Sequence, residues 1–351
     1  MKAFPRPAPQ SFIPLFLVLA LPLFLLISGA AAAQEGIGAG PLLSHNTHPL
    51  YTALPQWLPR EADVESPGSA AFTLLQSYAN NYFYIPPDAE DSTIVAHIDG
   101  EAWYTTLAGS IGVVEGLELN LSLRTALHYA GIFDPFLSGY HHLFGFPNAG
   151  RDLEPPNRHR VYLENDSAVL IDSSASFFEP NALQIEVRGR LYSSPGGHSR
   201  LAGGAMLKLP LASTSHPLSG SGADAGVRLY YSLRCGAFDL HASGGAALLR
   251  RPDFLAAEYF TPLTMPYSLS LHWTALRRWI LGATIQGTTS PFSTGYGRVD
   301  RPSSAVTFGS EWVLGERNRL QLSMSQEFIT FAASDVAVNV VWRYQLSFSE
   351  R

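Results

Sequence analysis

The sequence predicts an all-β protein, a closed antiparallel transmembrane β-barrel of about 12 strands. Of its 351 residues 46% are hydrophobic and only 15% are charged, whereas soluble proteins average about 25% charged residues. Apolar and polar residues alternate over long segments of the chain. Behind the N-terminus, no segment has the roughly 18 consecutive apolar residues that a membrane helix needs. Membrane-crossing strands account for all three observations.

The alternation has period two, which is typical of a strand with one apolar face. It is clearest over residues 117–129, 183–191, 267–274, 320–328 and 336–348. The segments run about 10 to 14 residues, and about 9–11 residues suffice for a tilted strand to cross a bilayer. Aromatic residues at their ends match the two girdles of a membrane barrel. A soluble sandwich would carry more Lys and Glu on its polar faces. In lipid every backbone polar group needs a partner, so these strands must close into a barrel.

The number of strands that the sequence pattern suggests is odd and therefore needs correction. The pattern gives 13 strands, but single-chain bacterial barrels have an even number. Either a strand between Arg158 and Asn181 lies outside the wall, giving 12, or Asn165-Asp166 turns a hairpin, giving 14. We expect 12, with short turns facing the periplasm and the longer connections facing outward.

The N-terminus predicts export. Lys2 and Arg6 precede an apolar run from Phe12 to Ile27, and Ala31-Ala32-Ala33 forms a small-residue cleavage site, as in a secretory signal peptide. A membrane anchor is the alternative. We expect residues 1–33 as signal peptide, 34–68 as a periplasmic or lumen segment, 69–348 as the barrel and 349–351 as an extension. The predicted location is the outer membrane of a Gram-negative bacterium. Cys235 has no partner for an internal disulfide.

The C-terminal strand carries the aromatic residues Trp342, Tyr344 and Phe348. An aromatic last strand resembles the assembly signal of bacterial outer-membrane barrels. We therefore expect the barrel-assembly machinery and outer-membrane lipid to be partners of the protein. The formal net charge of −6 is unfavourable for binding nucleic acid.

Charged and polar residues on the inward faces are the candidate functional residues of the lumen: Arg124, His128, Glu186, Arg188, Arg190, Arg228, Glu327 and Arg343, with Arg234 at a turn. Charges inside a protein must be paired or solvated. They either line a water-filled channel, where an excess of Arg favours anions, or form an ion-paired plug. The sequence leaves both alternatives open.

The loop after the third strand predicts a short helix. Asp134 before Pro135 suits a helix start and Gly145 suits its end. Phe136, Tyr140, Leu143 and Phe144 share a face at helical spacing. The helix either narrows the barrel mouth or packs on the rim aromatics.

His141 and His142, with Arg151 and Asp152 nearby, suggest a metal site at first sight. However, adjacent histidines on a helix point about 100° apart and do not form the zinc-binding i, i+4 pair. We therefore assign Arg151 and Asp152 a structural role and expect no metal and no cofactor.

Residues Phe133 to Asp152, which read FDPFLSGYHHLFGFPNAGRD, resemble the most specific stretch of an uncharacterised family, domain of unknown function 3187. Further stretches resemble that family over nearly the whole exported chain: residues 46–50 (NTHPL), 99–103 (DGEAW), 207–210 (LKLP) and 219–224 (SGSGAD). The resemblance implies an exported protein related in architecture to outer-membrane channels for small aromatic or apolar compounds. It implies no biochemical activity.

The favoured functional interpretation is a passive pore or porin-like transporter for small solutes. The alternative is a structural or surface-interaction barrel with a plugged lumen. A membrane-embedded hydrolase is a weaker third interpretation, because no spacing of Ser and His singles out a catalytic triad.

Overall fold

The computed structural model describes residues 40–85, 94–145, 155–165, 168–211, 222–252, 255–295, 299–329 and 334–348. The predicted signal peptide and residues 349–351 lie outside this part. Within it, twelve antiparallel strands form a closed wall. The ring closes because β1 pairs with both β2 and β15. The predicted fold class is therefore confirmed.

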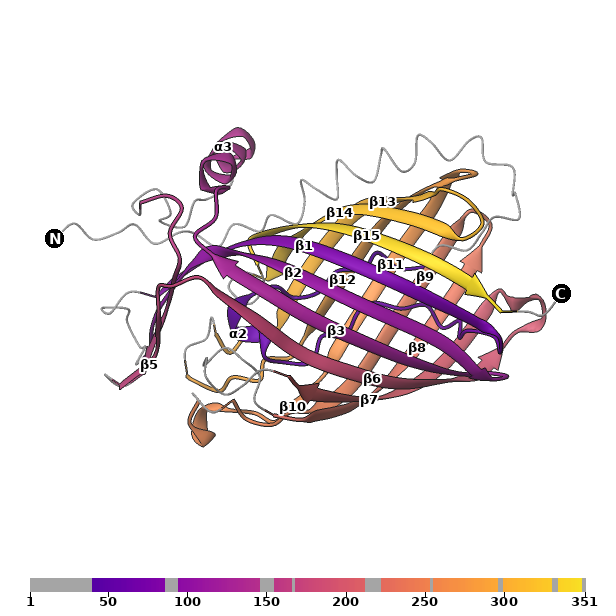
Figure 1. Cartoon of the computed structure of the whole chain (residues 1–351), viewed down its shortest axis with the longest axis horizontal. Helices are drawn as coiled ribbons and strands as arrows, with labels where there is room; N and C mark the ends of the chain where they lie inside the picture. The colour runs from indigo at the N-terminus through magenta and orange to yellow at the C-terminus, as the bar shows by residue number, and fades with distance from the viewer. Residues whose placement is uncertain are drawn as a thin grey trace.

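The wall strands follow one another around the barrel in chain order (Figure 1). They are β1 (Ser69–Ile85), β2 (Ile94–Val114), β3 (Leu117–Tyr129), β6 (Phe177–Ser193), β7 (Ser199–Pro210), β8 (Asp224–Cys235), β9 (Phe238–Leu248), β11 (Pro266–Leu276), β12 (Trp279–Thr288), β13 (Ser303–Val313), β14 (Asn318–Ile329) and β15 (Val336–Ser347). Short connections gather at the end where β15 finishes, which we call the short-turn end. The opposite end is the long-loop end.

The odd number of strands is resolved by a hairpin outside the wall. β4 (Arg160–Asn165) and β5 (Ala168–Ser173) pair with each other. β4 also pairs with the first residues of β2, from Ile94 to Asp99, whereas β3 pairs with β2 from Glu101 onward. β2 thus extends beyond the wall, and the hairpin continues the sheet at the long-loop end. The prediction of 12 strands is confirmed.

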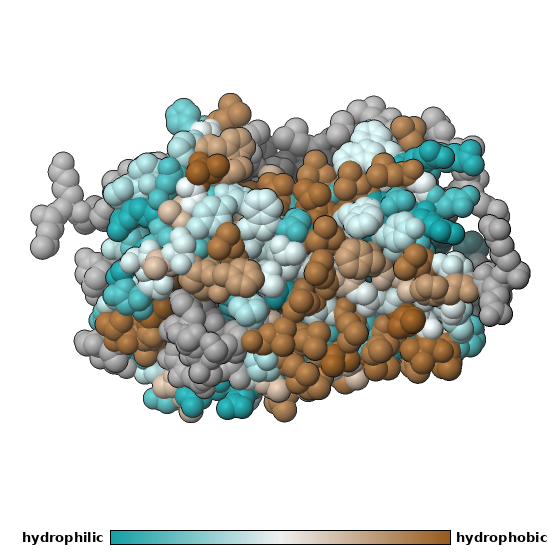
Figure 2. All heavy atoms as spheres, viewed as in Figure 1, coloured by the Kyte–Doolittle hydropathy of each residue, from teal (hydrophilic) through white to brown (hydrophobic). Residues whose placement is uncertain are grey.

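The outer surface is apolar because the alternation points every second side chain at lipid. On β3, Leu121 and Leu127 are exposed, whereas Glu118, Arg124 and His128 are buried. Apolar side chains crowd the outer face of the strands in Figure 2. Among the described residues, no helix is long and apolar enough to cross a membrane.

Aromatic residues lie on the outer surface toward both ends of the wall. Tyr84, Trp103 and Phe178 are exposed toward the long-loop end, and Trp279 and Trp342 toward the short-turn end. In adjacent aromatic pairs only one ring faces outward: Trp103 is exposed, and its neighbour Tyr104 is fully buried. Period two explains this, because neighbouring side chains in a strand point to opposite faces.

Candidate functional site: a plug in the barrel lumen

The lumen is occupied by residues 40–68, which we call the plug. The plug begins at the short-turn end, where the guanidinium of Arg343 donates to Pro41 O at 2.8 Å. It reaches the long-loop end at α2 (Pro49–Thr52) and returns to Gly68, which lies beside β1 and accepts a hydrogen bond from Phe348 N at 2.6 Å. Figure 1 shows this indigo segment inside the wall. The plug therefore enters and leaves by the same mouth.

At the long-loop end, α2 sits in an apolar cluster. His48 begins the helix, and its Nδ1 accepts the Leu50 amide at 3.3 Å. Tyr51 meets Phe292 edge to face, with ring centroids 5.6 Å apart. The remaining buried members of the cluster come from the plug, the wall, the β4–β5 hairpin and the loops: Leu50, Leu54, Phe83, Ile85, Ile94, Ala96, Ile98, Val161, Leu163, Ile171, Ala247, Leu249, Leu255 and Val299. Apolar packing thus seals this end of the lumen.

Neutral hydrogen bonds hold one flank of the plug against β12, β13 and β14. The amide and carbonyl of Leu43 bond the side chain of Gln321, each at 2.9 Å. Ser44 Oγ lies 2.8 Å from Thr307 Oγ1 and accepts from Gln286 Nε2 at 3.0 Å. Asn46 Nδ2 donates to Ser303 Oγ at 2.6 Å. These contacts involve small hydroxyl and amide side chains, which the inward faces of these strands supply.

Cations hold the other flank. Arg124 donates to Thr52 O, Lys208 to Ala53 O, and Arg228 to Leu58 O at 3.2 Å. Apart from α2, the plug has no regular secondary structure, so its buried carbonyls depend on donors from elsewhere. The inward cations in turn need acceptors. The plug carbonyls and the inward cations therefore satisfy each other's hydrogen-bonding needs.

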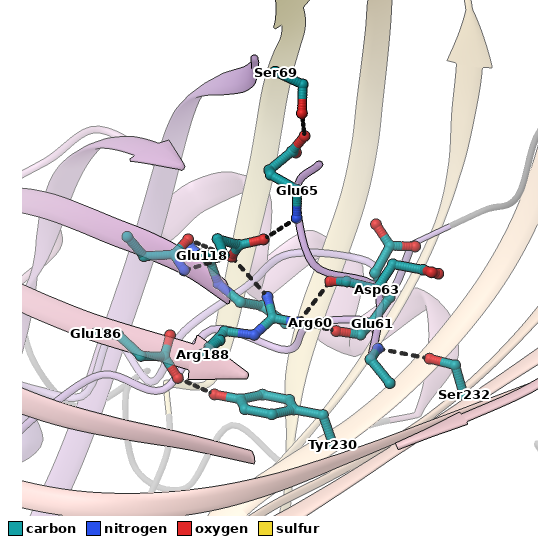
Figure 3. A network of polar contacts seen from close by, with 12 residues as sticks. Arg60, Glu61, Asp63, Glu65, Ser69, Glu118, Glu186, Arg188, Tyr230 and Ser232 are labelled. Carbon is teal, nitrogen blue, oxygen red and sulfur yellow. Dashed lines mark hydrogen bonds and ion pairs between the residues drawn. The ribbon is translucent and has the colours of Figure 1, made fainter. Parts of the chain in front are cut away.

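A charged network links the plug to β3, β6 and β8 toward the short-turn end (Figure 3). Arg188 donates to Asp63 O at 2.8 Å and to Glu61 O, and it lies 3.3 Å from Glu118 Oε1. Its guanidinium carbon is 4.6 Å from the ring centroid of Tyr230. Glu118 also accepts the Glu65 amide at 2.7 Å. Arg188 thus joins two plug carbonyls, a carboxylate and an aromatic ring.

Two cavities are lined partly by the plug. One of 230 Å³ lies toward the short-turn end, and charged residues dominate its lining, among them Arg60, Glu61, Glu118, Arg188 and Arg343. A smaller one of 50 Å³ has a neutral lining that includes His45, Trp57 and Gln286. The larger of these two cavities therefore lies at the mouth where both ends of the plug are found.

Burial controls the protonation of plug residues. It lowers the pKa of His45 to about 3, with a further contribution from the positive charge of Arg124. Burial also lowers the pKa of His48 to about 3. The pKa of Glu61 is raised, first by burial and then by the negative charge of Asp63. Both histidines are therefore neutral in the plugged state.

The structure buries five of the eight predicted lumen residues: Arg124, His128, Glu186, Arg188 and Arg228. Arg343 is half-buried and contacts the plug, and Glu327 is half-buried near the long-loop end of β14. Arg190 is exposed at the short-turn end, where it pairs with Glu115 at 2.8 Å. Arg234 pairs with Asp239 at 2.8 Å near the same end.

Sequence reasoning named Glu186 and Glu327 but missed three other inward carboxylates that pair with cations. Glu118 pairs with Arg188, and Asp224 pairs with the buried Lys208 at 2.8 Å. Glu311 lies 3.2 Å from Arg319 and 3.4 Å from Arg343. A signal existed for one pair, because Lys208 and Asp224 both fall in stretches shared with the family. The Arg excess inferred from sequence therefore overlooked these acidic partners.

The predicted loop helix is α3 (Asp134–Phe144), but it does not narrow the mouth. It projects clear of the wall at the long-loop end (Figure 1). The cause lies in the backbone just before the helix and in its first residue. Glu101 on β2 accepts the amides of Ile132 at 3.0 Å and Phe133 at 2.6 Å. Asp134 accepts the Asn157 amide at 2.6 Å. The plug fills the lumen in its place.

Other predicted loop residues are only partly described. The side chain of His142 is exposed. The side chains of Tyr140, His141 and Phe144, and the whole of Arg151 and Asp152, lie outside the described residues. Among the residues that are described, no group of His, Cys, Asp and Glu could hold a metal ion.

On the last strand, Trp342 is exposed, with its ring 5.9 Å from Phe72 and 5.9 Å from Tyr344. Tyr344 is half-buried, and Phe348 is exposed just beyond β15. Both Trp342 and Phe348 are therefore accessible on the barrel surface. Their role as an assembly signal stays a prediction.

A closed twelve-strand wall with an apolar exterior and a polar lumen defines the class of the fold: a transmembrane β-barrel. The sequence assigns the chain to a family. Residues 16–346 match the model of a family described as proteins of unknown function, DUF3187, and the chain belongs to that family. No protein of curated function matches it.

Solved structures share the barrel fold. The COG4313 outer membrane channel from Pseudomonas putida F1 superposes with a TM-score of 0.53 at 10% identity, over 81% of this chain and 98% of that one. The NanC porin gives a TM-score of 0.44 at 7% identity, over 79% and 100% of the two chains. The P. putida toluene transporter TodX gives 0.37 at 10% identity, over 90% and 100%. At these identities the likeness concerns the fold alone.

Proposed function

We propose that this protein is an outer-membrane channel for small solutes, closed by its own plug and opened when the plug moves toward the periplasm. The observation that carries the proposal is the path of the plug, whose two ends lie at one mouth, beside Arg343 and Gly68. By the rule for outer-membrane barrels, the short turns mark this mouth as periplasmic. A hairpin-shaped segment can leave such a mouth without threading through the wall.

The contacts of the plug support reversible movement. Side-chain hydrogen bonds and ion pairs connect it to the wall. When the plug moves away, water can hydrogen-bond to most of the groups that form these contacts. The cavity of 230 Å³ lies toward the mouth that the plug would use. Displacement of the plug would leave a lumen lined by charges of both signs in pairs. Such a lining favours passage of small polar solutes and gives little selectivity between cations and anions.

A structural or surface-interaction barrel is the second candidate, favoured by the apolar seal around α2. A hydrolase is less well supported. Ser232 Oγ does lie 2.8 Å from His241 Nδ1, on the inward face. However, Ser232 Oγ also accepts the Ala62 amide at 2.8 Å, and neither residue lines the cavities described above. The hydroxyl is thus engaged with the plug backbone, and no described cavity gives a substrate access to it.

A disulfide between plug and wall tests the channel proposal. Ser44 and Thr307 lie with their hydroxyl oxygens 2.8 Å apart, so we would combine Ser44→Cys and Thr307→Cys in a Cys235→Ser background. In planar bilayers we expect no current from the oxidised protein and current after reduction. Equal current in both states would mean that solutes pass around the plug and would overturn the displacement step. No current in either state would contradict the channel and favour the structural barrel.

The plug should also respond to pH. In the plugged state His45 and His48 have a pKa of about 3, and once displaced they titrate near their ordinary value of 6.5. Between these values the displaced state binds more protons, so the plugged state loses stability as pH falls below about 6.5. A protonated His45 would also face the cation of Arg124, and a protonated His48 could no longer accept the Leu50 amide.

From the titration of His45 and His48, we therefore expect the open fraction of single channels to rise as the pH falls below about 6.5. Above that pH, these two histidines should leave the open fraction constant. The control is the double variant His45→Gln and His48→Asn, since Asn also caps a helix N-terminus. If the double variant shows the same pH dependence as the native chain, these histidines are not the cause.

A further inference from the structure

α3 and the residues just before it leave three large apolar side chains exposed. Ile132 is 73% exposed, Phe136 63% and Leu143 76%, although Leu137 of the same helix is buried. Brown, hydrophobic spheres mark this part of the molecule in Figure 2, in the place where Figure 1 draws α3. Apolar surface in water costs about 25 cal/mol per Å², so another phase or partner is expected to cover it.

Within α3, the exposed apolar residues Phe136 and Leu143 lie on one face of the helix, and Ile132 precedes the helix. Phe136 and Leu143 are seven residues apart, which is close to two turns, so they lie above one another. Ser138 and His142 fall on other sides of the helix. An amphipathic helix with aromatic and aliphatic residues on one face is typical of a segment that lies in a membrane interface.

A row of aromatic rings connects this face to the lipid-facing wall. Trp103 on β2 points outward and is 48% exposed. Its ring meets that of Tyr78 on β1 at 6.2 Å, and Tyr78 meets Phe133 at 4.7 Å. Phe133 then meets Phe136 at 5.6 Å. The apolar face of α3 is therefore continuous with the aromatic girdle of the barrel, where Trp and Tyr sit at headgroup level.

The base of the helix is fixed in position. Asp134 accepts Asn80 Nδ2 at 3.0 Å in addition to the Asn157 amide, and Glu101 holds the two preceding amides. Gly131 has φ +81, and an added Cβ there would overlap the Glu101 carboxylate. These bonds set the direction in which α3 leaves the wall.

We propose that α3 is an interfacial helix that lies in the outer leaflet beside β1 and β2, with Phe136 and Leu143 among the acyl chains. The occupant of its apolar face is lipid. Burial of these side chains among the acyl chains stabilises the loop that carries α3. The helix then lies beside the barrel and leaves its mouth unobstructed. The inference is independent of whether the barrel conducts.

Site-directed fluorescence tests it in the full chain. In a Cys235→Ser background, Phe136→Cys, Ser138→Cys, His142→Cys and Leu143→Cys are each labelled with an environment-sensitive dye. The proteins are reconstituted in phosphatidylcholine vesicles with or without a nitroxide near the carbonyl end of the acyl chain. We expect the labels at 136 and 143 to emit at shorter wavelength, to be quenched by the nitroxide and to escape aqueous iodide. The labels at 138 and 142 serve as matched controls and should show the reverse.

Two outcomes would overturn the proposal. Labels at 136 and 143 that iodide quenches as strongly as those at 138 and 142 would place the helix in water. Labels shielded from both quenchers would indicate a protein partner or a second copy of the chain. Heat-modifiable migration of each labelled protein verifies that its barrel is folded, so a misfolded variant cannot mimic either result.

Discussion

Deletion of residues 40–66 should convert a mostly closed barrel into a permanently open one. The plug supplies the apolar seal around α2 and fills the lumen between β3, β6, β7 and β8 on one side and β12, β13 and β14 on the other. If the displaced state of the native protein has a population near 1%, the mean current per molecule rises roughly 100-fold. The measurement is planar-bilayer conductance of the refolded variant.

The barrel itself should survive this deletion. Apart from an isolated bridge between Pro67, which the deletion retains, and Gly112, the twelve strands pair with each other and not with the plug. Water can replace the plug carbonyls as acceptors for Arg124, Lys208 and Arg228. Heat-modifiable migration is therefore expected to be retained. We also expect weak ion selectivity, because Glu118, Asp224 and Glu311 balance the inward cations.

The control for the deletion is the plug itself, supplied as a separate peptide of residues 40–66. Added on the short-turn side, the peptide should reduce the current, and added on the opposite side it should not. A folded deletion variant without any current would contradict the channel function and leave the structural barrel as the better interpretation.

The second large effect is expected from Arg188→Ala. Arg188 joins Glu61 O, Asp63 O, Glu118 and the ring of Tyr230, and its removal leaves the Glu118 carboxylate buried without this partner. Breaking a buried ion pair costs roughly 3–5 kcal/mol. The plugged state bears this cost, because displacement of the plug exposes Glu118 to water. A loss of about 3 kcal/mol raises the displaced-to-plugged ratio more than 100-fold.

Arg190→Ala is the matched control, two residues further along β6. Arg190 is exposed and pairs with Glu115 at the rim, and exposed pairs contribute at most about 1 kcal/mol. Single-channel open fraction should therefore change strongly in the first variant and little in the second. Arg188→Lys should lie between them, since an ammonium retains the charge but lacks the planar fork that spans several acceptors. Equal open fractions for the Ala variants would mean that the network does not retain the plug.

The sequence predicted the wall well because alternation is a local property. Each of Leu121, Leu127, Glu118 and Arg124 reveals its side of the sheet through its neighbours alone. The loop helix was also predictable, since Asp134-Pro135 and Gly145 are local signals. Its direction was not, because that depends on Glu101, which lies on a different strand and holds the backbone before the helix.

Residues 34–68 were expected in the periplasm or the lumen, but the path and contacts of the plug could not be predicted, for the same physical reason. The plug has one helix of four residues and no periodicity, and its contacts are long-range. Leu43 and Gln321, for example, are 278 positions apart in the chain. Inward cations were visible in the sequence, but their acceptors are backbone carbonyls of this distant segment, which carry no sequence signature. The open alternatives of a water-filled or plugged lumen therefore needed the three-dimensional arrangement.

The single mouth used by the plug has a consequence for biogenesis. The seam of the wall closes when β1 pairs with β15, with Ser69 opposite Ser347. A segment threaded from one opening to the other would have to be in place before that seam forms. A hairpin that enters and leaves on one side has no such requirement, so the cylinder can be completed first and filled afterwards. Membrane insertion and closure of the pore are then separable events in the life of the molecule.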